Sequence, residues 1–430
     1  MTSPTQAPPS HRDPAPTDAT GQGADTAPAD DPALVAARTR IAEIDRTLLD
    51  LLAERRAMSR RIAEHKLATG TAVRNTRVER EGLAALIRRG RELGLEAPFI
   101  TRLFQTVIED SVQLQTATLH AARNAEAGRS EHRVAVLGGP GSYSHQAAEK
   151  YVARRGGTLV PVSGRSFADV ARAVGDGAAD YALLPIENTT SGSINEVYDL
   201  LYDTDLHIIG EITHRIDHAL LAKDAGLTPE AISVLYVHPQ VYAQCSHFLA
   251  RLGDARIVYC DSTADAMGRV VQGDDPHAAA IGSGNSGALF DLHAIVSDLA
   301  NQKQNHTRFI VVGPKPTQVP GQVDAKTSVI FVTGQEAGAL VNALAAMRDN
   351  RINMVKLESR PIPGKPWAER FYLDVAGNLN DPRLDRALDQ MRSHTRRMKV
   401  LGCYPADSVQ PVDMTLAAAI DTGDGDAHAP

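Results

Sequence analysis

The densest group of hydrogen-bonding and ionisable residues in this 430-residue chain lies between Asp180 and Tyr198. A short apolar run, Tyr181 to Leu184, is typical of a buried strand, and Pro185 is expected to end it. Ser193 and Glu196 have the spacing of a capping box, which predicts a helix start. The polar residues between these two elements are Glu187, Asn188, Thr189, Thr190 and Ser191. Because a helix start offers unpaired backbone N–H groups, we expect an anionic substrate to bind there.

The same residue types are also ordinary turn formers, so this stretch alone does not establish a site. A second motif, Asn305-His-Thr-Arg-Phe309, precedes an apolar run that predicts a strand from Phe309 to Val312. Together with the stretch from Asp180 to Asn195, it resembles the paired signatures of prephenate dehydratase. The resemblance implies a reaction in which prephenate loses carbon dioxide and its ring hydroxyl together.

By this resemblance the essential threonine of the family falls on Thr307, which we predict to hydrogen-bond the departing hydroxyl. The residues predicted to bind the substrate are Glu187, Asn188, Thr189, Thr190, Ser191 and Arg308. Glu187 is also a candidate proton source.

From Leu34 onward, apolar residues recur every three or four positions and predict a long helix with one apolar stripe. The stripe consists of Ile41, Ile44, Leu48, Leu51, Met58 and Ile62. Arg38, Arg55 and Lys66 fall on the same side, where a cation is costly unless an anion meets it. Surface snorkelling is the alternative for any single one of these cations.

Two further helical patterns follow, from about Val78 to Leu93 and from about Pro98, and their apolar faces include Glu79, Ser111 and Gln115. The first helix would be roughly 50 Å long, too long for two shorter helices to cover. We therefore expect an intertwined dimer.

This helical segment resembles the all-helical chorismate mutase, whose substrate-binding positions fall on Arg38, Arg55, Lys66, Asn75, Glu79, Ser111 and Gln115. The resemblance implies that Arg38 of a partner subunit and Arg55 hold the two carboxylates of chorismate. It also implies that Lys66 and Gln115 face the ether oxygen, and that Glu79 accepts a hydrogen bond from the ring hydroxyl. A rearrangement of this kind needs no nucleophile or cofactor, only a fixed conformer and charge stabilisation.

Two positions depart from the mutase pattern. The family usually has Asp where this chain has Asn75, and often Arg where it has Val78. Carboxylate binding would then depend on Arg74 or Arg77.

After a polar linker at residues 120–132, strand and helix patterns alternate and predict an α/β region of two lobes. The resemblance implies a periplasmic-binding-protein-like dehydratase domain over residues 132–314, with the substrate between its lobes. Several polar residues after predicted strands or at helix starts are expected to face that cleft if the sheets are parallel: His238, Gln240, Gln244, Ser262 and Thr263. Ser262 and Thr263 could instead be helix N-caps, and His238 an ordinary loop residue. A dinucleotide-binding fold is the weaker alternative, because Gly138, Gly139 and Gly141 do not form GxGxxG.

Residues 326–404 read strand, helix, strand, strand, helix, strand, which predicts a ferredoxin-like βαββαβ module. Two of its segments resemble the motifs with which the regulatory (ACT) domain of this family binds phenylalanine between subunits. They are Gly338, Ala339, Leu340 and Val341, and Glu358, Ser359, Arg360 and Pro361. A purely structural dimerisation domain is the alternative. The last predicted helix runs from Pro382 to Met398.

Composition excludes several classes of protein. A net charge of -7 argues against a nucleic-acid binder, and no signal peptide or run of about 18 apolar residues suggests secretion or a membrane span. We therefore expect a cytosolic protein. Cys245, Cys260 and Cys403 are odd in number and far apart, which favours buried free thiols over disulfides or a metal site. Residues 1–31 and the residues after Met414 have the composition of disordered segments, and we assign residues 405–430 to a C-terminal tail.

Taken together, roughly residues 34 to 415 resemble the bifunctional chorismate mutase and prephenate dehydratase of bacterial phenylalanine synthesis. We predict a multi-domain homodimer or higher homo-oligomer with a mutase domain at 32–122, a dehydratase domain at 132–314 and a regulatory domain at 326–404. Chorismate and prephenate are the expected substrates and phenylalanine the inhibitor, with no cofactor and no metal. Two alternatives stay open: a prephenate or arogenate dehydratase with a weakened mutase domain, and a non-catalytic two-lobed small-molecule sensor.

Overall fold

The computed structural model describes residues 31–124, 128–365 and 367–407. The chain divides into two compact units, Met1–Arg55 and Arg56–Pro430. The predicted N-terminal tail and most of the predicted C-terminal tail lie outside the described residues. The first residues of the latter belong to the fold, because Pro405 ends a strand and Asp407 hydrogen-bonds to Arg154 and Thr213.

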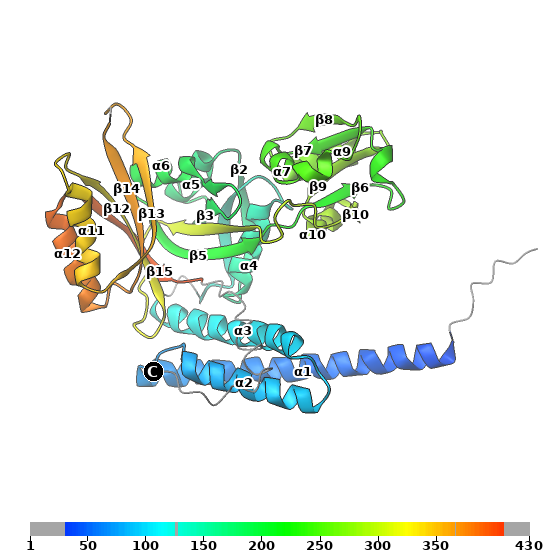
Figure 1. Ribbon diagram of the computed structural model, residues 1–430, viewed down its shortest axis with the longest axis horizontal. Helices are drawn as coiled ribbons and strands as arrows, with labels where there is room; N and C mark the ends of the chain where they lie inside the picture. The colour runs from blue at the N-terminus through cyan, green and yellow to red at the C-terminus, as the bar shows by residue number, and fades with distance from the viewer. Residues whose placement is uncertain (1–30, 125–127, 366, 408–430) are drawn as a thin grey trace, which may run out of the picture. The chain divides into compact units, whose positions relative to one another are not determined.

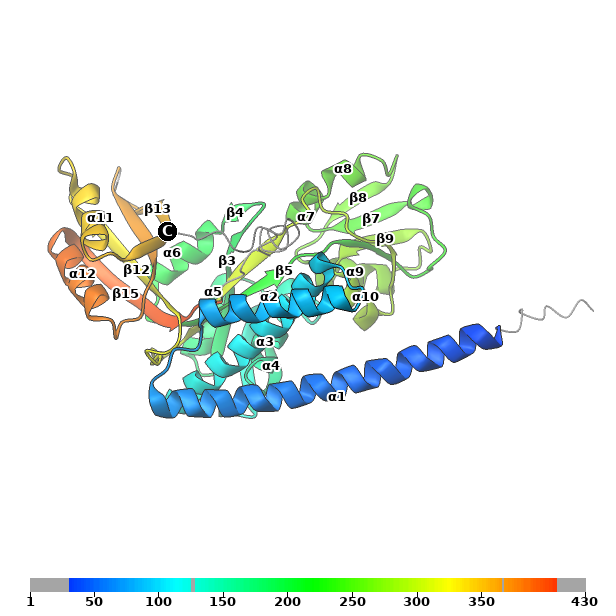
Figure 2. The ribbon, with the colours of Figure 1, turned by 60° about the horizontal axis from the view of Figure 1, so that its bottom comes forward.

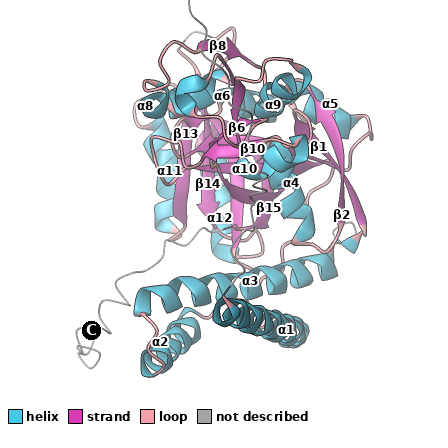
Figure 3. Ribbon diagram, turned by 90° about the vertical axis from the view of Figure 1, so that its right-hand side faces the viewer, coloured by secondary structure: helices cyan, strands magenta, loops and turns pink. Residues whose placement is uncertain are grey.

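The first part of the described chain is helical, as predicted. It consists of α1 (Pro32–Thr69), α2 (Thr76–Glu92) and α3 (Ala97–Arg123). In Figure 3, α1, α2 and α3 are drawn with no strand among them. Leu83 and Ile87 of α2 pack against Ile100 of α3, while Ala63 near the end of α1 packs in a cluster with Leu119 of α3.

The apolar stripe of α1 is not covered within one chain. Its six predicted members, Ile41, Ile44, Leu48, Leu51, Met58 and Ile62, are 40 to 58 % exposed. Contiguous exposed apolar side chains of this kind are typical of an interaction surface.

The next region has two lobes, each built on its own sheet. The first sheet has the order β2-β1-β3-β11-β5, with β4 paired to β3. Its strands are β1 (Glu131–Leu137), β2 (Thr158–Gly164), β3 (Tyr181–Asn188), β4 (Gly192–Ser193), β5 (His207–Arg215) and β11 (His306–Gly313). β1 is parallel to β2 and β3, whereas β11 is antiparallel to β3 and β5.

Helices cover both faces of this first sheet. α4 (Tyr143–Ala153) packs on one face, and α5 (Phe167–Gly175) and α6 (Asn195–Asp203) pack on the other. The chain leaves the first lobe after β5 and returns to it at β11.

The second lobe carries a sheet of order β10-β6-β9-β7-β8. Its strands are β6 (Ala219–Ala222), β7 (Val234–Val237), β8 (Arg256–Tyr259), β9 (Ala278–Gly282) and β10 (His293–Val296). α7 (Pro239–Gln244) and α8 (Ser246–Leu249) pack on one face and α9 (Thr263–Gln272) on the other, around the strands seen in Figure 2. The short elements η2 (Pro229–Ala231), α10 (Gly284–Gly287) and η3 (Ala288–Phe290) complete this lobe.

A third domain has the element order βαββαβ and a sheet of order β13-β14-β12-β15. Its elements are β12 (Ala325–Thr333), α11 (Ala339–Asp349), β13 (Asn353–Pro361), β14 (Glu369–Ala376), α12 (Pro382–Ser393) and β15 (Thr395–Pro405). Figure 1 shows both helices on one face of this sheet. Phe331 packs toward these helices, whereas Ile330 and Tyr404 join the core of the first lobe.

Two sequence predictions of secondary structure are wrong. α12 ends at Ser393 rather than Met398, because Met398 pairs with Phe331 of β12 as part of β15. β3 continues through Pro185, where the pairing register shifts and leaves Ile186 as an extra residue. Proline is tolerated at such a bulge because it needs no partner for an N–H group.

All three cysteines are buried, as predicted, and burial raises the pKa of Cys245 to about 12 and that of Cys260 to about 11. Within the described part of the chain, no helix combines the length and apolar character that a membrane crossing requires. The described residues also contain no group of three or more His, Cys, Asp or Glu arranged to hold a metal ion.

Candidate active sites

Asn188 ends β3 with a buried side chain whose orientation is fixed by the backbone. Its Oδ1 accepts hydrogen bonds from the backbone N–H groups of Thr190 and Ser191, each at 2.9 Å. A backbone N–H can only donate, so Oδ1 is the acceptor end of this amide and Nδ2 the donor end. Nδ2 therefore donates to Asn305 Oδ1 at 2.7 Å and to Thr307 Oγ1 at 2.9 Å.

Thr307 lies in β11 opposite Asn188 and is also buried. Because Asn188 Nδ2 donates to Oγ1, the threonine hydroxyl keeps its own proton for another acceptor. No described residue accepts that proton. Thr307 is therefore poised to donate a hydrogen bond to a ligand in the cleft.

Gln244 extends this polar cluster into the second lobe. Since Asn305 Oδ1 accepts from Asn188, its Nδ2 donates to Gln244 Oε1 at 3.0 Å. Gln244 Nε2 in turn donates to Ser191 Oγ at 2.9 Å, and Gln240 Nε2 donates to the same oxygen at 2.8 Å. Both glutamines thus reach the loop that follows β3. We call Asn188, Ser191, Gln244, Asn305 and Thr307 the amide cluster.

His218, between β5 and β6, forms a hydrogen bond with Gln244. It was not predicted from the sequence as a site residue. Its ring is 1 % exposed, and Nε2 lies 2.8 Å from Gln244 Oε1, which is an acceptor, so Nε2 carries a proton. Burial lowers the pKa of His218, which keeps the ring neutral. Nδ1 is then an acceptor that faces the Tyr143 hydroxyl at 2.8 Å, whose proton is shared with the Asp217 carbonyl oxygen at 2.6 Å.

His214 was also missed in the sequence, although it pairs directly with Thr307 across β5 and β11. Burial and the nearby ammonium of Lys150 lower the pKa of His214 to about 4. A neutral imidazole therefore lies beside Thr307. Unlike His214 and His218, Asn305 belongs to the sequence motif around Thr307 and could have been proposed from it.

The remaining predicted residues of the loop have different surroundings. Thr189 Oγ1 accepts from the backbone N–H of His306 at 2.9 Å and donates to a backbone carbonyl, so its hydroxyl is used within the fold. Thr190 Oγ1 is buried without a hydrogen-bond partner among the described residues. Glu187 forms an ion pair with Lys356 of the third domain at 2.8 Å. Of these three side chains, only Thr190 keeps its full hydrogen-bonding capacity.

Arg308 is not brought to the amide cluster. It follows Thr307 in β11, and successive side chains of a strand point to opposite faces. Its guanidinium donates to Glu211 at 2.7 Å, to Asp374 at 2.6 Å and to Tyr404 at 2.9 Å. The strand pleat therefore directs Arg308 to the third domain, in place of the substrate contact expected from the sequence.

The predicted capping box at Ser193 does not form. Ser193 Oγ donates to Glu358 Oε2 at 2.6 Å, and α6 begins at Asn195 without a side-chain cap. The hydroxyl that would have capped the helix is used by the third domain. Because α6 still begins at Asn195 and no side chain caps it, its first backbone N–H groups remain available, and the anion site at this helix start stays a prediction.

In the helical domain, the loop before α2 brings together three predicted mutase residues. Lys66 Nζ donates to the Val73 carbonyl oxygen at 2.6 Å; burial lowers the pKa of Lys66, and the Glu79 carboxylate opposes that effect. Asn75 caps α2 by accepting from the Val78 backbone N–H at 3.2 Å, while Glu79 Oε1 accepts from the Asn75 backbone N–H at 3.1 Å. Asn75 therefore fixes the start of the helix that carries Glu79.

Ser111 and Gln115 lie on the buried side of α3, each 7 % exposed. Ser111 Oγ donates to the Val107 carbonyl oxygen at 3.1 Å. Gln115 Oε1 is buried and has no hydrogen-bond partner among the described residues. Because an unsatisfied buried acceptor costs about 1–3 kcal/mol, this amide is suited to a ligand that supplies a donor.

Arg38 and Arg55 lie on α1 within the unit that ends at Arg55, the first exposed and the second half-buried. Val78 is 55 % exposed and offers no polar group. Arg74 contacts Glu79 at 3.3 Å and Glu109 at 2.5 Å, whereas Arg77 points to Glu81 at 4.0 Å. Of the two arginines that could compensate for Val78, only Arg74 therefore contacts Glu79.

The two predicted effector motifs lie at the start of α11 and at the end of β13. Gly338 has a φ of 85°, a left-handed conformation that favours glycine, and α11 begins directly after it with no side-chain cap. Ala339 is buried, Leu340 is half-buried and Val341 is 68 % exposed. In the second motif, Arg360 forms an ion pair with Asp199 of α6 at 2.7 Å.

Ser359 and Pro361 complete the second motif as residues of β13. Of its four residues, Glu358 and Arg360 contact the first lobe, through Ser193 and Asp199. This motif is thus directly connected to the hairpin and helix that follow Asn188.

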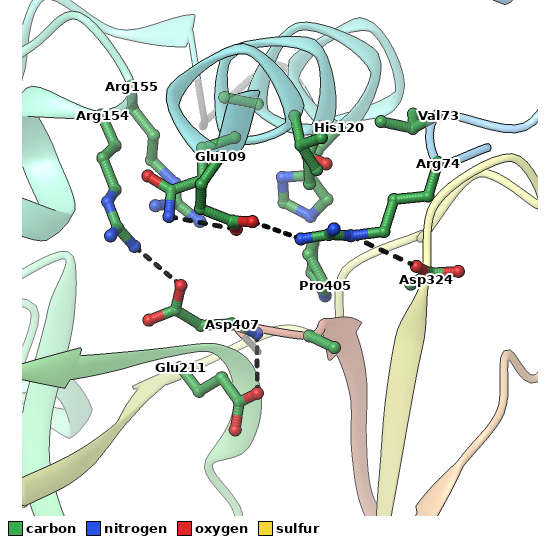
Figure 4. A pocket seen from close by; sticks show the side chains of 15 residues that line it. Val73, Arg74, Glu109, His120, Arg154, Arg155, Glu211, Asp324, Pro405 and Asp407 are labelled. Atoms are coloured by element: carbon green, nitrogen blue, oxygen red, sulfur yellow. Dashed lines mark hydrogen bonds and ion pairs between the residues drawn. The ribbon is translucent and has the colours of Figure 1, made fainter. Parts of the chain in front are cut away.

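Figure 4 shows a pocket at which α3, α4 and the end of β15 meet. Arg74 reaches from the helical domain to Asp324, next to β12, at 3.9 Å. Arg154, directly after α4, pairs with Asp407 at 2.9 Å, and the backbone N–H of Asp407 donates to Glu211 at 2.8 Å. Ion pairs therefore connect the helical domain, the first lobe and the third domain.

Comparisons with known proteins agree with this division. Residues 37–116 match the family model of chorismate mutase type II, and residues 134–317 match that of prephenate dehydratase. A bifunctional chorismate mutase/prephenate dehydratase of Enterobacter agglomerans is 48 % identical over 381 residues, covering 88 % of this chain and 98 % of that protein. One of Escherichia coli K12 is 47 % identical over 383 residues, covering 89 % and 98 %.

Among solved structures, a prephenate dehydratase of Arthrobacter aurescens in complex with L-Phe is 25 % identical, with a TM-score of 0.58. The match covers 68 % of this chain and 98 % of that one. The fold of this part of the chain is therefore similar to that of the Arthrobacter aurescens protein.

Proposed function

Because the chain belongs to the family of bifunctional chorismate mutase/prephenate dehydratases and has both of its enzymatic domains, we propose how its own residues carry out the two reactions. The enzyme rearranges chorismate to prephenate and converts prephenate to phenylpyruvate. The amide cluster is assigned to the second reaction, and the observation that carries this assignment is the unused hydroxyl proton of Thr307.

In the dehydratase step, the bond between the ring and its carboxylate breaks, carbon dioxide leaves, and the electron pair makes the ring aromatic as the hydroxyl departs. Thr307 donates a hydrogen bond to that hydroxyl, which leaves as water after taking a proton. Asn188 supports this role, since it occupies the acceptor side of Oγ1. Thr190, with its unpartnered hydroxyl, is assigned to substrate binding.

Glu187 is assigned to coupling with the third domain rather than to proton donation, because its carboxylate is held by Lys356. Ser191 and Thr189 shape the loop through their hydrogen bonds to Asn188, Gln244 and the His306 backbone. The proton that completes the departure of water then comes from solvent or substrate.

The test is a pair of variants at Thr307. Thr307→Val removes the hydroxyl at nearly constant volume and should lower the dehydratase kcat by roughly 10²–10³-fold, the usual cost of losing one positioned hydrogen-bond donor. Thr307→Ser keeps the hydroxyl and should retain much of the activity. Unchanged turnover of prephenate in Thr307→Val would overturn the assignment, while chorismate consumption serves as the control for folding.

For the mutase step, we assign Lys66 and Gln115 to the ether oxygen, Glu79 to the ring hydroxyl, and Arg38 and Arg55 to the carboxylates. Asn75 and Ser111 complete the substrate-binding set. Support comes from the mutual influence of Lys66 and Glu79. Lys66→Met should abolish most chorismate turnover and leave prephenate turnover intact.

The exposed stripe of α1 supports a homodimer in which two copies of this helix cover each other's apolar side chains. Arg38 would then act in the partner's site. Sedimentation of the full chain at several concentrations tests this assembly directly.

Phenylalanine inhibition is proposed from the two effector motifs, and the βαββαβ domain is assigned as an ACT regulatory domain. The chain's single tryptophan, Trp367, is 96 % exposed in the loop after the second motif and provides a fluorescent reporter. L-phenylalanine should change its emission and lower the dehydratase rate over the same concentration range. The matched control is the prephenate assay without effector.

We therefore keep the hypothesis of a bifunctional enzyme and drop that of a non-catalytic small-molecule sensor. A weakened mutase is compatible with the family membership, as is activity on arogenate. Separate measurement of chorismate, prephenate and arogenate consumption distinguishes these cases. The cytosolic location stays a prediction.

A further inference from the structure

A second pocket, of about 420 Å³, lies at the end of the first-lobe sheet opposite to the amide cluster. Tyr181 begins β3 and Gly313 ends β11, and both line this pocket. Asn188 and Thr307 stand at the other ends of the same two strands. The pocket is therefore separate from the dehydratase site. Of the sequence motifs, only the stretch from Asp180 to Asn195 reaches it, through its first two residues, Asp180 and Tyr181.

Its charged lining is strongly cationic in a chain whose net charge is -7. Four cationic side chains, Arg129, Arg133, Arg155 and Lys315, line it together with a single carboxylate, Asp180. That carboxylate is already used: Asp180 accepts from Arg133 Nη2 at 2.7 Å and from the Arg133 backbone N–H at 2.9 Å. The pocket thus attracts anions and has no free carboxylate for an ammonium group.

Arg155 is the cation best placed to bind such an anion. Its guanidinium lies 3.5 Å from the centroid of the Tyr151 ring and donates to the Tyr151 carbonyl oxygen at 3.2 Å. Among the described residues, no carboxylate lies within ion-pair distance of it. An arginine that is oriented by ring stacking retains further N–H donors for a carboxylate.

His120 supplies the second observation. Its side chain is 3 % exposed, and Nε2 has no hydrogen-bond partner among the described residues. Burial and the positive charge of Arg155 lower the pKa of His120 to about 4, so the ring is neutral. Figure 4 shows the ring projecting from α3 into the adjoining pocket, which Arg155 also lines. A buried ring nitrogen left without a partner is suited to a polar ligand atom.

Most of the remaining lining is apolar, with Asn124 and Thr317 as polar exceptions. Tyr151 and Tyr181 present aromatic rings, and Val174, Ile209 and Pro314 add aliphatic surface. A pocket of a few hundred cubic ångströms, with apolar walls and a few convergent polar groups, is the usual form of a small-molecule site. An inorganic anion would leave these walls uncovered.

We propose that this pocket binds a small aromatic carboxylate, with Arg155 holding the carboxylate, His120 offering a hydrogen bond and the two tyrosines packing on the ring. A free amino acid is disfavoured, because its ammonium group would meet arginines rather than a carboxylate. The site is therefore distinct from the phenylalanine site proposed for the third domain.

Benzoate is the probe, measured by calorimetry on the full-length enzyme. Arg155→Gln should weaken benzoate binding at least tenfold, whereas Arg269→Gln, an exposed arginine of α9 in the other lobe, should leave it unchanged. Both variants should keep the prephenate and chorismate turnover of the parent enzyme. Equal benzoate binding by the parent and Arg155→Gln overturns the proposal.

Inorganic phosphate and L-phenylalanine complete the set of probes. Phosphate binding as tight as that of benzoate, or loss of the L-phenylalanine response in Arg155→Gln, contradicts an aromatic carboxylate site. Should Arg155→Gln fail to fold, Arg155→Lys and His120→Phe replace it. The histidine NMR signal that is missing from His120→Phe identifies His120, and benzoate should shift that signal in the parent enzyme; an unshifted His120 signal overturns the proposal.

Discussion

The apolar stripe of α1 and the amide cluster differ in how far their side chains are buried within one chain. On α1, six large apolar side chains are 40 to 58 % exposed in one chain, so this helix needs a partner surface. In the amide cluster, Asn188, Asn305 and Thr307 are all buried, and their hydrogen bonds close within one chain. The first region depends on assembly, and the second depends on the direction of each hydrogen bond.

The difference follows from the chemistry of the two reactions. A rearrangement without proton transfer requires charges around a folded substrate, and such charges can be contributed by separate subunits. Loss of a hydroxyl group requires a donor whose proton points to one atom. A donor of this kind must have its other side occupied, as Asn188 does for Thr307.

The largest effect should come from Asn188→Asp, which reverses a hydrogen bond without changing side-chain size. A carboxylate oxygen would replace Nδ2 and face Thr307 Oγ1 and Asn305 Oδ1, so Thr307 would donate to residue 188 instead of the substrate. We expect the dehydratase kcat to fall by roughly 10²–10³-fold, and the mutase rate to stay unchanged. Steady-state assays with prephenate and chorismate measure both.

The control is Asn188→Ala, which removes the amide but does not redirect the proton of Thr307. It should be less damaging than Asn188→Asp. If the alanine variant were the slower of the two, bond direction would not be the decisive property of the cluster.

The second largest effect should come from Leu48→Glu on α1. Leu48 is 52 % exposed in one chain, so a glutamate is tolerated by the monomer but places charge inside a dimer interface. We expect the dimer to dissociate and the mutase rate to fall at least about tenfold. A loss of about 1.4 kcal/mol of association free energy already weakens the dimer tenfold. The dehydratase rate should be retained.

Sedimentation velocity and paired assays check this result. A matched variant is Glu54→Gln, at an exposed polar position of the same helix, which should stay dimeric and active. A Leu48→Glu enzyme that remained dimeric with full mutase activity would show that α1 is not the interface.

The sequence was sufficient for the helical region, for the alternation of strands and helices after it and for most of the strands, because periodicity and the motifs report which faces are buried. It was also sufficient to bring Asn188 and Thr307 together. It did not predict that Arg308 points to the third domain rather than to the substrate, because a motif does not show which residue of a strand faces the substrate. Ser193 failed for a similar reason, since its partner Glu358 is 165 residues away in the chain.

The role of His218 could not be predicted from the sequence, because it depends on two residues that are distant in the chain. Tyr143 and Gln244 approach it from different lobes, and only the fold brings them together. A single histidine in an apolar stretch is usually a buried core residue. The donor and acceptor assignment became possible only once Asn188 was fixed by backbone N–H groups.

The third largest effect concerns stability in acid. It arises from two buried histidines that are not part of α1. The pKa values of His120 and His214 are lowered from 6.5 to about 4 by burial, with Arg155 and Lys150 as further causes. Their folded pKa values lie below the unfolded one, so this contribution to the free energy of unfolding is complete above pH 6.5. It is lost as the pH falls toward 4, by up to about 3 kcal/mol for each residue.

Urea unfolding at a series of pH values between 7.5 and 4.5 measures this loss. The variant His214→Asn should flatten the profile in that window, because the ionisable group is removed. A profile for His214→Asn that coincides with that of the parent enzyme would exclude His214 as a source of acid sensitivity.

The smallest effect is expected from Val78→Arg, which restores the residue that the mutase family often has. Val78 is 55 % exposed on α2, so its replacement removes little packing. A new guanidinium next to Asn75 and Glu79 adds a cation for a substrate carboxylate. It also competes with Arg74, which already contacts Glu79 at 3.3 Å.

These two consequences of Val78→Arg oppose each other, so the net gain should be small. One exposed charge-assisted contact contributes about 1 kcal/mol, which corresponds to roughly a fivefold rise in kcat/KM for chorismate. The dehydratase rate should not change. If Val78→Arg leaves the mutase unaffected while Arg74→Gln inactivates it, then Arg74 has already taken over the function of the missing arginine, and the helical region was complete without it.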